Sequence, residues 1–143
     1  MTVSPAASSE NARRTMQANR RVSGVEMRYR VGLRRAGLVG YRVSMRLPGR
    51  PDVVFTRARV AVFVHGCFWH RCPTCNLPRP KAHSEFWDAK FAENLLRDTN
   101  AEAALVADGW LTIVVWEHEI ETDLPGVVAR THDIIRRRLA AGR

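Results

Sequence analysis

The sequence predicts an α/β domain in which a mixed sheet is flanked by helices. Its 143 residues, 45% of them hydrophobic and 26% charged, have the size and composition of one globular domain. Apolar residues recur at helical spacing in three segments, and four shorter runs alternate or are apolar throughout, as strands do. The resulting order of helix, three strands, helix, strand, helix is typical of a sheet covered by helices.

The helices and strands follow from the spacing of apolar residues. The predicted helices are Val25–Ala36, Ser84–Ala107 and Leu124–Ala141. Ser84 is expected to cap the second helix, and Gly109 follows its end. The predicted strands are Tyr41–Leu47, Asp52–Phe55, Arg59–Val64 and Leu111–Trp116. The third strand is nearly all apolar, so we expect it to be central and covered on both faces.

Positive charge is concentrated in the first part of the chain. Residues 1–60 contain 13 Arg and three acidic residues, whereas residues 61–143 contain 10 basic and 11 acidic ones. Arg outnumbers Lys 21 to 2, and its planar guanidinium suits phosphate oxygens. A GC-rich genome would also raise the Arg content, but it would not place the charge at one end. A nucleic acid is therefore the expected partner.

The first 24 residues are polar and basic and show no apolar period. This predicts a flexible arm over residues 1–24, followed by a single domain over residues 25–143. The arm lacks the apolar core of a signal peptide, and no apolar run approaches the roughly 20 residues of a membrane span. We therefore expect a cytoplasmic protein that does not bind membranes.

All three cysteines lie within nine residues, as Cys67, Cys72 and Cys75. An odd number argues against a disulfide framework, and thiolates at this spacing suit Zn²⁺, which takes four N or S ligands in a tetrahedron. The candidates for the fourth ligand are His65, His70, His83 and His118. Two alternatives are a redox-active Cys-x-x-Cys pair, which fits poorly because no helix starts at Cys72, and three free thiols.

A second set of side chains suits a metal-dependent nuclease. Asp52 begins one predicted strand, and the next strand runs into His65 and His70. Mg²⁺ takes oxygen ligands, so Asp52 and a backbone carbonyl of the next strand would hold it. His70 would deprotonate the attacking water, and Asp98 would fix the tautomer of His70. The plainer alternatives are a turn or cap role for Asp52 and a zinc-ligand role for His70.

Phe68 and Trp69 are adjacent aromatic residues in the cysteine-containing loop. Two neighbours in an extended segment do not point into the same core, so at least one is expected to be exposed. Aromatic or apolar wedges unstack base pairs, and mismatched steps resist least. The alternative is that both residues cover the zinc site or the core.

Motifs distributed over residues 13–118 carry a family resemblance. They are Leu47-Pro48-Gly49-Arg50-Pro51-Asp52, Val60-Ala61-Val62-Phe63-Val64-His65-Gly66-Cys67-Phe68-Trp69-His70, Phe86-Trp87 with Asn94 and Arg97-Asp98, Gly109-Trp110, and Val115-Trp116-Glu117. The arm segment 14–20 adds to them. Together they resemble the very-short-patch-repair (Vsr) DNA mismatch endonucleases.

The resemblance implies a fold, a reaction and two metals. The fold would be restriction-endonuclease-like, with a structural Zn²⁺. The reaction would be a Mg²⁺-dependent nick in one strand, 5′ to the thymine of a T·G mismatch. Such mismatches arise when 5-methylcytosine is deaminated, so the partner would be double-stranded DNA that contains one.

The resemblance also implies roles for individual residues. The implied catalytic residues are Glu26, Asp52, His65, His70 and Asp98. The implied zinc ligands are Cys67, Cys72, Cys75 and His118, which frees His70 for catalysis. The implied DNA-intercalating residues are Phe68, Trp69 and, from the arm, Met16. Asp52 and the backbone carbonyl of Val64 would bind Mg²⁺.

Two other functions are compatible with the same residues. One is a zinc-stabilised DNA-binding module without catalysis, which needs neither Asp52 nor Asp98. The other is a nickase that acts on unmismatched DNA and differs only in substrate. A single nick needs one active site, so a monomer is expected.

Overall fold

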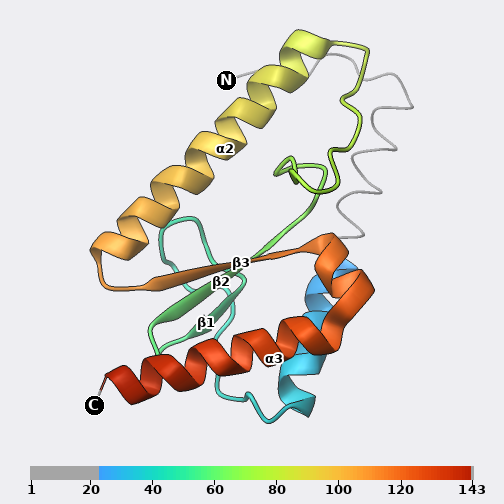
Figure 1. The fold of residues 1–143 in the computed structure, drawn as a ribbon. Helices are drawn as coiled ribbons and strands as arrows, with labels where there is room; N and C mark the ends of the chain where they lie inside the picture. The colour runs from blue at the N-terminus through green and yellow to red at the C-terminus, as the bar shows by residue number, and fades with distance from the viewer. Residues whose placement is uncertain (1–22, 143) are drawn as a thin grey trace.

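A three-stranded sheet forms the centre of the structure, a computed structural model that describes residues 23–142 (Figure 1). The strands are β1 (Val53–Phe55), β2 (Val60–His65) and β3 (Leu111–Trp116). The helices are α2 (Ser84–Ala107), α3 (Glu117–Ala141) and an earlier helix over residues 23–35. The central strand, β2, is antiparallel to β1 and parallel to β3, so the predicted mixed sheet is confirmed.

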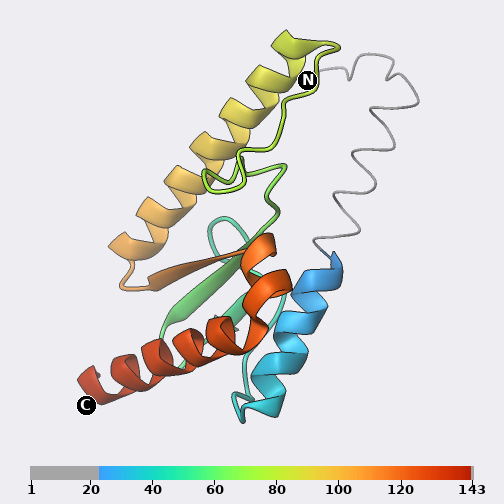
Figure 2. The ribbon, with the colours of Figure 1, turned by 45° about the vertical axis from the view of Figure 1, so that its right-hand side comes forward.

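Helices cover both faces of this sheet (Figures 1 and 2). Alternate residues of β2 point to opposite faces. Val60 and Val62 pack in the cluster formed with the 23–35 helix and α3, whereas Ala61 packs in the cluster formed with α2. β2 is therefore buried almost throughout, as its apolar sequence predicts.

The 23–35 helix and α3 are packed closely against each other. The hydroxyls of Tyr29 and Thr131 lie 2.8 Å apart in a buried hydrogen bond, and burial raises the pKa of Tyr29 to about 12. A Cβ at Gly32 would lie 2.9 Å from Cγ2 of Val128, so only glycine fits this crossing without a shift. Residues 23 and 24 of the predicted arm belong to this helix; residues 1–22 lie outside the described part.

α2 begins at Ser84 and ends at Ala107, as the apolar period predicts. The expectation that Ser84 caps it is wrong: the N-cap is His83, whose φ is 57°, and no side chain caps the first turn. Leu105 packs on the sheet, whereas the first half of α2 extends beyond the sheet alongside the loop of residues 66–83 (Figure 1). In this overhang, Trp87 and Phe91 of α2 pack against Phe68 of the loop.

The predicted strand Tyr41–Leu47 is not formed. Only Arg42 pairs with β1, in a single bridge to Val54. Ser44 follows with a φ of 58°, in the left-handed region, and an extended strand cannot continue through that conformation. The segment is a loop whose backbone pairs with the sheet at one residue only.

The last helix starts earlier than predicted, at Glu117 rather than Leu124. A short helical segment comes first, and the chain then kinks at Asp123, whose φ is −152°. Oδ1 of Asp123 accepts a hydrogen bond from the N–H of Gly126, and Pro125 sits in the first turn of the second segment, where its missing N–H is tolerated. The sequence pattern therefore identified the second segment only.

Within the described range, residues 23–142, no helix is long and apolar enough to cross a membrane.

Candidate active site and metal centre

The carboxylate of Asp52 extends the pairing between β1 and β2. The N–H of Asp52 donates to the carbonyl of Val62 at 2.9 Å, and the N–H of Val64 donates to Oδ2 of Asp52 at 2.6 Å. The side chain thus takes the place of a strand carbonyl one step further along the ladder. The carboxylate is therefore held against the end of β2, at the residue before His65.

Asp52 ionises with more difficulty than an ordinary carboxyl. Burial raises its pKa to about 6 despite the hydrogen bond from Val64, and the nearby charge of Glu26 adds to this rise. Both carboxylates line one hollow of about 300 Å³, where Glu26 also pairs with Arg30. Two carboxylates in one hollow repel each other, and a hard divalent cation with oxygen ligands would relieve that repulsion.

His65, His70 and Asp98 meet beside this end of β2. Nδ1 of His70 lies 2.5 Å from Oδ2 of Asp98, and the rings of His65 and His70 stack with centroids 3.8 Å apart and planes 5° apart. An ionised carboxylate only accepts hydrogen bonds, so Nδ1 of His70 carries a proton and its Nε2 keeps a lone pair. An imidazole in this state can take a proton from water.

His65 is a neutral neighbour of that base. Burial lowers the pKa of His65 to about 4, and repulsion from His70 lowers it further. Two stacked imidazoles repel each other when both are protonated, and only His70 has a carboxylate in direct contact.

The three cysteines and His118 form a separate cluster. Their ligand atoms all lie within 4.8 Å of one another, and Nδ1 of His118 is 3.4 Å from Sγ of Cys67 and 3.6 Å from Sγ of Cys72. Tetrahedral zinc with ordinary bond lengths places its S and N ligands about 3.6 Å apart. The cluster fits a zinc ion, and it selects His118 from the histidines left open by the sequence.

The environment of Cys67 explains why a cation belongs there. All three thiols are free, and burial raises the pKa of Cys67 to about 12. A buried thiol that ionises so reluctantly becomes a ligand only when a metal compensates its charge. The His70 ring is engaged with Asp98 instead, so it is not needed to complete the cluster.

Glu117 stands in one of the sequence motifs, but no role was predicted for it; it lies between β3 and His118. Its side chain is 6% exposed, and its Oε1 accepts a hydrogen bond from the N–H of Cys67 at 3.0 Å. This bond ties the start of the cysteine loop to the end of β3. The signal available in the sequence was an acidic residue placed directly after a buried strand.

Phe68 and Trp69 lie in an aromatic cluster rather than in solvent. Phe68 is 8% exposed, and its ring centroid is 6.0 Å from that of Trp87 and 5.6 Å from that of Phe91. Trp69 is only partly buried, 5.7 Å from Trp87. The structure thus shows the packed arrangement that was the alternative to exposure. Met16, the third predicted intercalating residue, lies outside the described residues.

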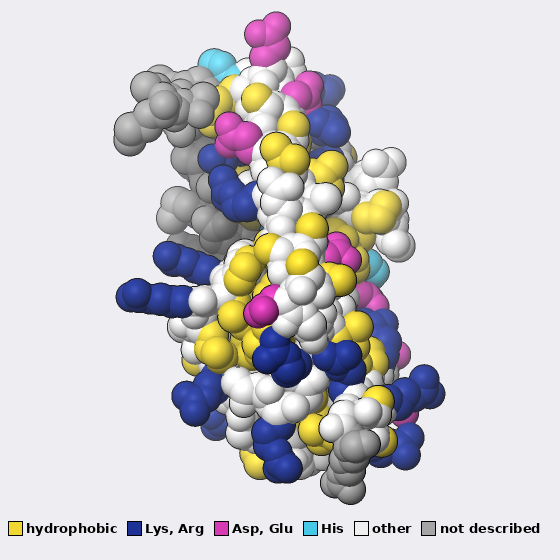
Figure 3. Space-filling model, turned by 90° about the vertical axis from the view of Figure 1, so that its left-hand side faces the viewer, with side chains coloured by type: hydrophobic (Ala, Val, Ile, Leu, Met, Phe, Trp, Pro, Cys, Tyr) yellow, Lys and Arg dark blue, Asp and Glu magenta, His cyan; other side chains and the backbone are white. Residues whose placement is uncertain are grey.

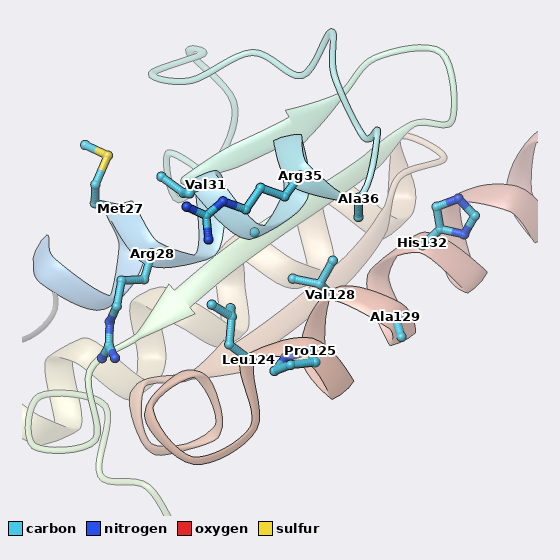
Figure 4. A pocket seen from close by; sticks show the side chains of 11 residues that line it. Met27, Arg28, Val31, Arg35, Ala36, Leu124, Pro125, Val128, Ala129 and His132 are labelled. Atoms are coloured by element: carbon cyan, nitrogen blue, oxygen red, sulfur yellow. The ribbon is translucent and has the colours of Figure 1, made fainter.

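Other surface features do not converge on these groups. On the face in Figure 3, Lys and Arg side chains surround exposed apolar ones. A hollow of about 900 Å³ lies between the 23–35 helix and α3 (Figure 4). Met27 and Val31 line it, with Arg28 and Arg35 on the same wall, but none of its described lining residues is acidic or a cysteine. It offers neither a carboxylate nor a thiol for metal chemistry.

Comparison with known proteins links this geometry to DNA cleavage. The family model for the DNA mismatch endonuclease Vsr matches residues 6–76, a range that contains Asp52, both stacked histidines and the three cysteines. The DNA mismatch endonuclease Vsr of Escherichia coli is 36% identical over 97 residues, which are 68% of this chain and 62% of that protein.

Two nicking enzymes match over larger shares of their own length. The type II nicking enzyme V.XorIIP of Xanthomonas oryzae is 43% identical over 101 residues, which are 68% of this chain and 73% of that enzyme. The type II nicking enzyme V.NaeI of Lentzea aerocolonigenes is 35% identical over 134 residues, which are 89% of this chain and 80% of that enzyme. With its restriction-endonuclease-like fold, the chain is a DNA endonuclease and belongs to the Vsr family.

Proposed function

We propose that this protein nicks one strand of duplex DNA 5′ to the thymine of a T·G mismatch. The observation that carries the proposal is the contact between His70 and Asp98 at the end of β2, next to the buried carboxylate of Asp52. The similarity to a mismatch endonuclease supports the choice of substrate. The biological role would be repair of deaminated 5-methylcytosine, and one active site per nick makes a monomer sufficient.

Two metals would serve different purposes. Asp52 and the backbone carbonyl of Val64 would hold Mg²⁺, with Glu26 in the same hollow. When bound, Mg²⁺ supplies stabilisation of the negative charge that develops on the attacked phosphate. Cys67, Cys72, Cys75 and His118 would hold Zn²⁺ as a purely structural ion.

His70 would act as the general base. Its Nε2 takes a proton from the attacking water while the water oxygen bonds to phosphorus and the bond to the leaving oxygen breaks. Asp98 keeps Nδ1 protonated and stabilises the imidazolium that forms. His65, which stays neutral, stacks on the ring and limits its rotation.

The aromatic pair would recognise the weak step in the duplex. Trp69, the more exposed of the two, would enter the stack at the mismatch and Phe68 would follow from its cluster, with Met16 entering from the arm. Unstacking a T·G step takes less free energy than unstacking a matched one, so wedging favours the mismatch. Replacing both aromatic residues with alanine is expected to remove that preference.

The test is strand cleavage with Mg²⁺ on duplexes that carry T·G, each other mismatch, or none, in randomised flanking sequence. A nick confined to the thymine strand of T·G duplexes supports the proposal and also reports the sequence context. Equal cleavage of matched duplexes would contradict the proposed T·G specificity but not the proposed roles of the site residues. Binding without cleavage, by protein that holds zinc, would instead favour the non-catalytic DNA-binding module.

A further inference from the structure

Two arginines that the mechanism does not use lie beside the catalytic carboxylates. Arg46 and Arg50 line the same hollow of about 300 Å³ as Glu26 and Asp52. A hollow that binds only a cation is expected to be lined by acidic side chains, because guanidinium groups repel Mg²⁺. The presence of both acidic and basic side chains indicates a second, anionic ligand next to the metal position.

The loop that carries these arginines is anchored to the protein. Met45 and Leu47 pack against the cluster of Val54, Ala61, Leu105 and Trp110 on the α2 face of the sheet. Ser44 and Arg46, which alternate with them, are exposed, and both line the hollow together with Met45. The packing of Met45 and Leu47 therefore fixes the loop on either side of Arg46.

The backbone around Arg50 is held in a conformation that favours glycine. Gly49 and Arg50 both have positive φ, at 74° and 49°. A Cβ on Gly49 would lie 2.6 Å from Cβ of Ala101 and 3.0 Å from Phe63, so the loop is pressed against α2 and β2. Arginine at a left-handed position is unfavourable for the backbone, and such residues are concentrated at functional sites.

The arginine side chains of the hollow have hydrogen-bond donors without a partner in the described part of the protein. Among residues 23–142, neither Arg46 nor Arg50 has a hydrogen bond or ion pair through its guanidinium. Arg30 lines the hollow as well, and although it pairs with Glu26, its Nε is buried without an acceptor in the described part of the chain. Three guanidinium groups thus lie around one hollow with donors to spare.

We infer that Arg46 and Arg50 form a binding site for one DNA backbone phosphate next to the phosphate that is cut. Guanidinium groups donate two parallel hydrogen bonds to phosphate oxygens, and two of them on an anchored loop fix the position of a strand as well as its charge. Occupation of this site would place the neighbouring phosphate beside Asp52. The inference rests on the proposed nicking reaction for its substrate.

The experiment replaces single phosphates of the nicked strand with uncharged methylphosphonates, one position at a time. With the wild-type protein, one position beside the cut is expected to raise KM about 10-fold. With Arg46→Ala or Arg50→Ala, KM on unmodified DNA rises by a similar factor, and neutralising that one position has little additional effect. The dependence of log Kd on log salt should also become shallower by about one phosphate contact.

Arg57→Ala is the matched control, because Arg57 is also exposed but lies in the turn at the other end of β1. It removes the same charge and should leave the sensitivity to each methylphosphonate unchanged. Arg50→Lys should recover part of the loss, since it keeps the charge without the fork. A loss with Arg50→Ala no larger than with Arg57→Ala, or spread equally over all phosphates, would overturn the inference.

The two proposals fail in distinguishable ways. Wild-type protein that does not nick T·G duplexes contradicts the proposed function, and the methylphosphonate series is then read as Kd, which still tests the phosphate site. Wild-type protein that nicks, with Arg46 and Arg50 variants that retain the full sensitivity at every position, contradicts the phosphate site alone.

Discussion

Two groups of side chains share the loop that follows β2, and they are completed in different ways. The cysteine group draws three of its four ligands from nine consecutive residues and one, His118, from the start of α3. The proposed catalytic group takes His65 from the end of β2 and His70 from the loop, but Asp98 comes from α2 and Asp52 directly precedes β1. The first group is mostly local, and the second depends on how three elements meet.

The difference also appears in the electrostatics. The ligand atoms of the thiols and His118 all lie within 4.8 Å of one another, so one ion would engage all four. Asp52 is instead held with a pKa raised to about 6, beside Glu26 and two arginines whose guanidinium groups have no partner among the described residues. The proposed zinc site would therefore be complete with one ion, whereas the proposed catalytic site needs both a metal and the substrate.

His70→Ala is expected to show the largest difference between the two groups, because it should affect nicking but not zinc binding. Loss of the base should lower the nicking rate by about 10²- to 10⁴-fold, while zinc content and DNA affinity stay near wild type. Single-turnover nicking, metal analysis and a binding titration measure the three quantities. Loss of zinc in this variant would show that His70 belongs to the cysteine group.

Cys72→Ser tests the other group. Removal of a ligand should release zinc, lower Tm by about 10 °C or more, and make residues 65–83 sensitive to proteolysis. Nicking should fall as well, because His70, the proposed base, sits on the same loop and His65 directly precedes it. Metal analysis of the purified protein with a melting curve gives the answer. Retention of zinc and Tm would remove Cys72 from the ligand set, and if the variant does not fold, chelation of the wild-type protein provides the same comparison.

Asp98→Asn is expected to have an intermediate effect. The amide keeps the shape of the carboxylate but neither stabilises an imidazolium nor fixes the His70 tautomer, so kcat should fall about 10- to 100-fold with little change in KM. The decisive measurement is the dependence of kcat on pH, since a purely structural role of Asp98 would leave this dependence unchanged.

The smallest effect concerns the stability of Asp52→Asn. The folded pKa of Asp52, about 6, is above its ordinary value of 3.8, so wild-type stability falls as pH rises between these values. In Mg²⁺-free buffer, asparagine should add about 1–2 kcal/mol to the free energy of unfolding at pH 8 and about half of that at pH 5. In a separate assay with Mg²⁺, the variant should not nick DNA. Chemical denaturation at both pH values tests this. A gain that does not depend on pH would contradict the raised pKa.

The sequence predicted most of the fold because the relevant signals are local. The 24-residue α2 and the six-residue β3 were both obtained from apolar spacing, with their observed bounds. The strand predicted at Tyr41–Leu47 failed because its alternation reflects anchoring of a loop by Met45 and Leu47, not pairing. A period of two reports which side chains face inward, and it does not report where backbone hydrogen bonds go.

The candidate site was predicted unevenly for the same reason. The spacing of Cys67, Cys72 and Cys75 by itself predicts a metal site. His118 lies 51 residues after Cys67, so spacing alone could not identify it as the fourth ligand. The family resemblance supplied that choice, and the structure agrees with it. Glu117 and Arg50 stand in the quoted motifs, but no role was predicted for them or for Arg46, because the role of a single charged residue depends on neighbours that only the fold provides.

The bond between Cys67 and His118 through a metal has a topological consequence. It would close a ring of chain that contains the whole of α2, and with it Asp98. A cross-link of this length restricts the unfolded chain by about 4 kcal/mol in the chain-entropy model. α2, which carries Asp98, would thus lie within a segment of chain that is fixed at both ends. Loss of the metal ion would change the fraction of molecules in which Asp98 contacts His70.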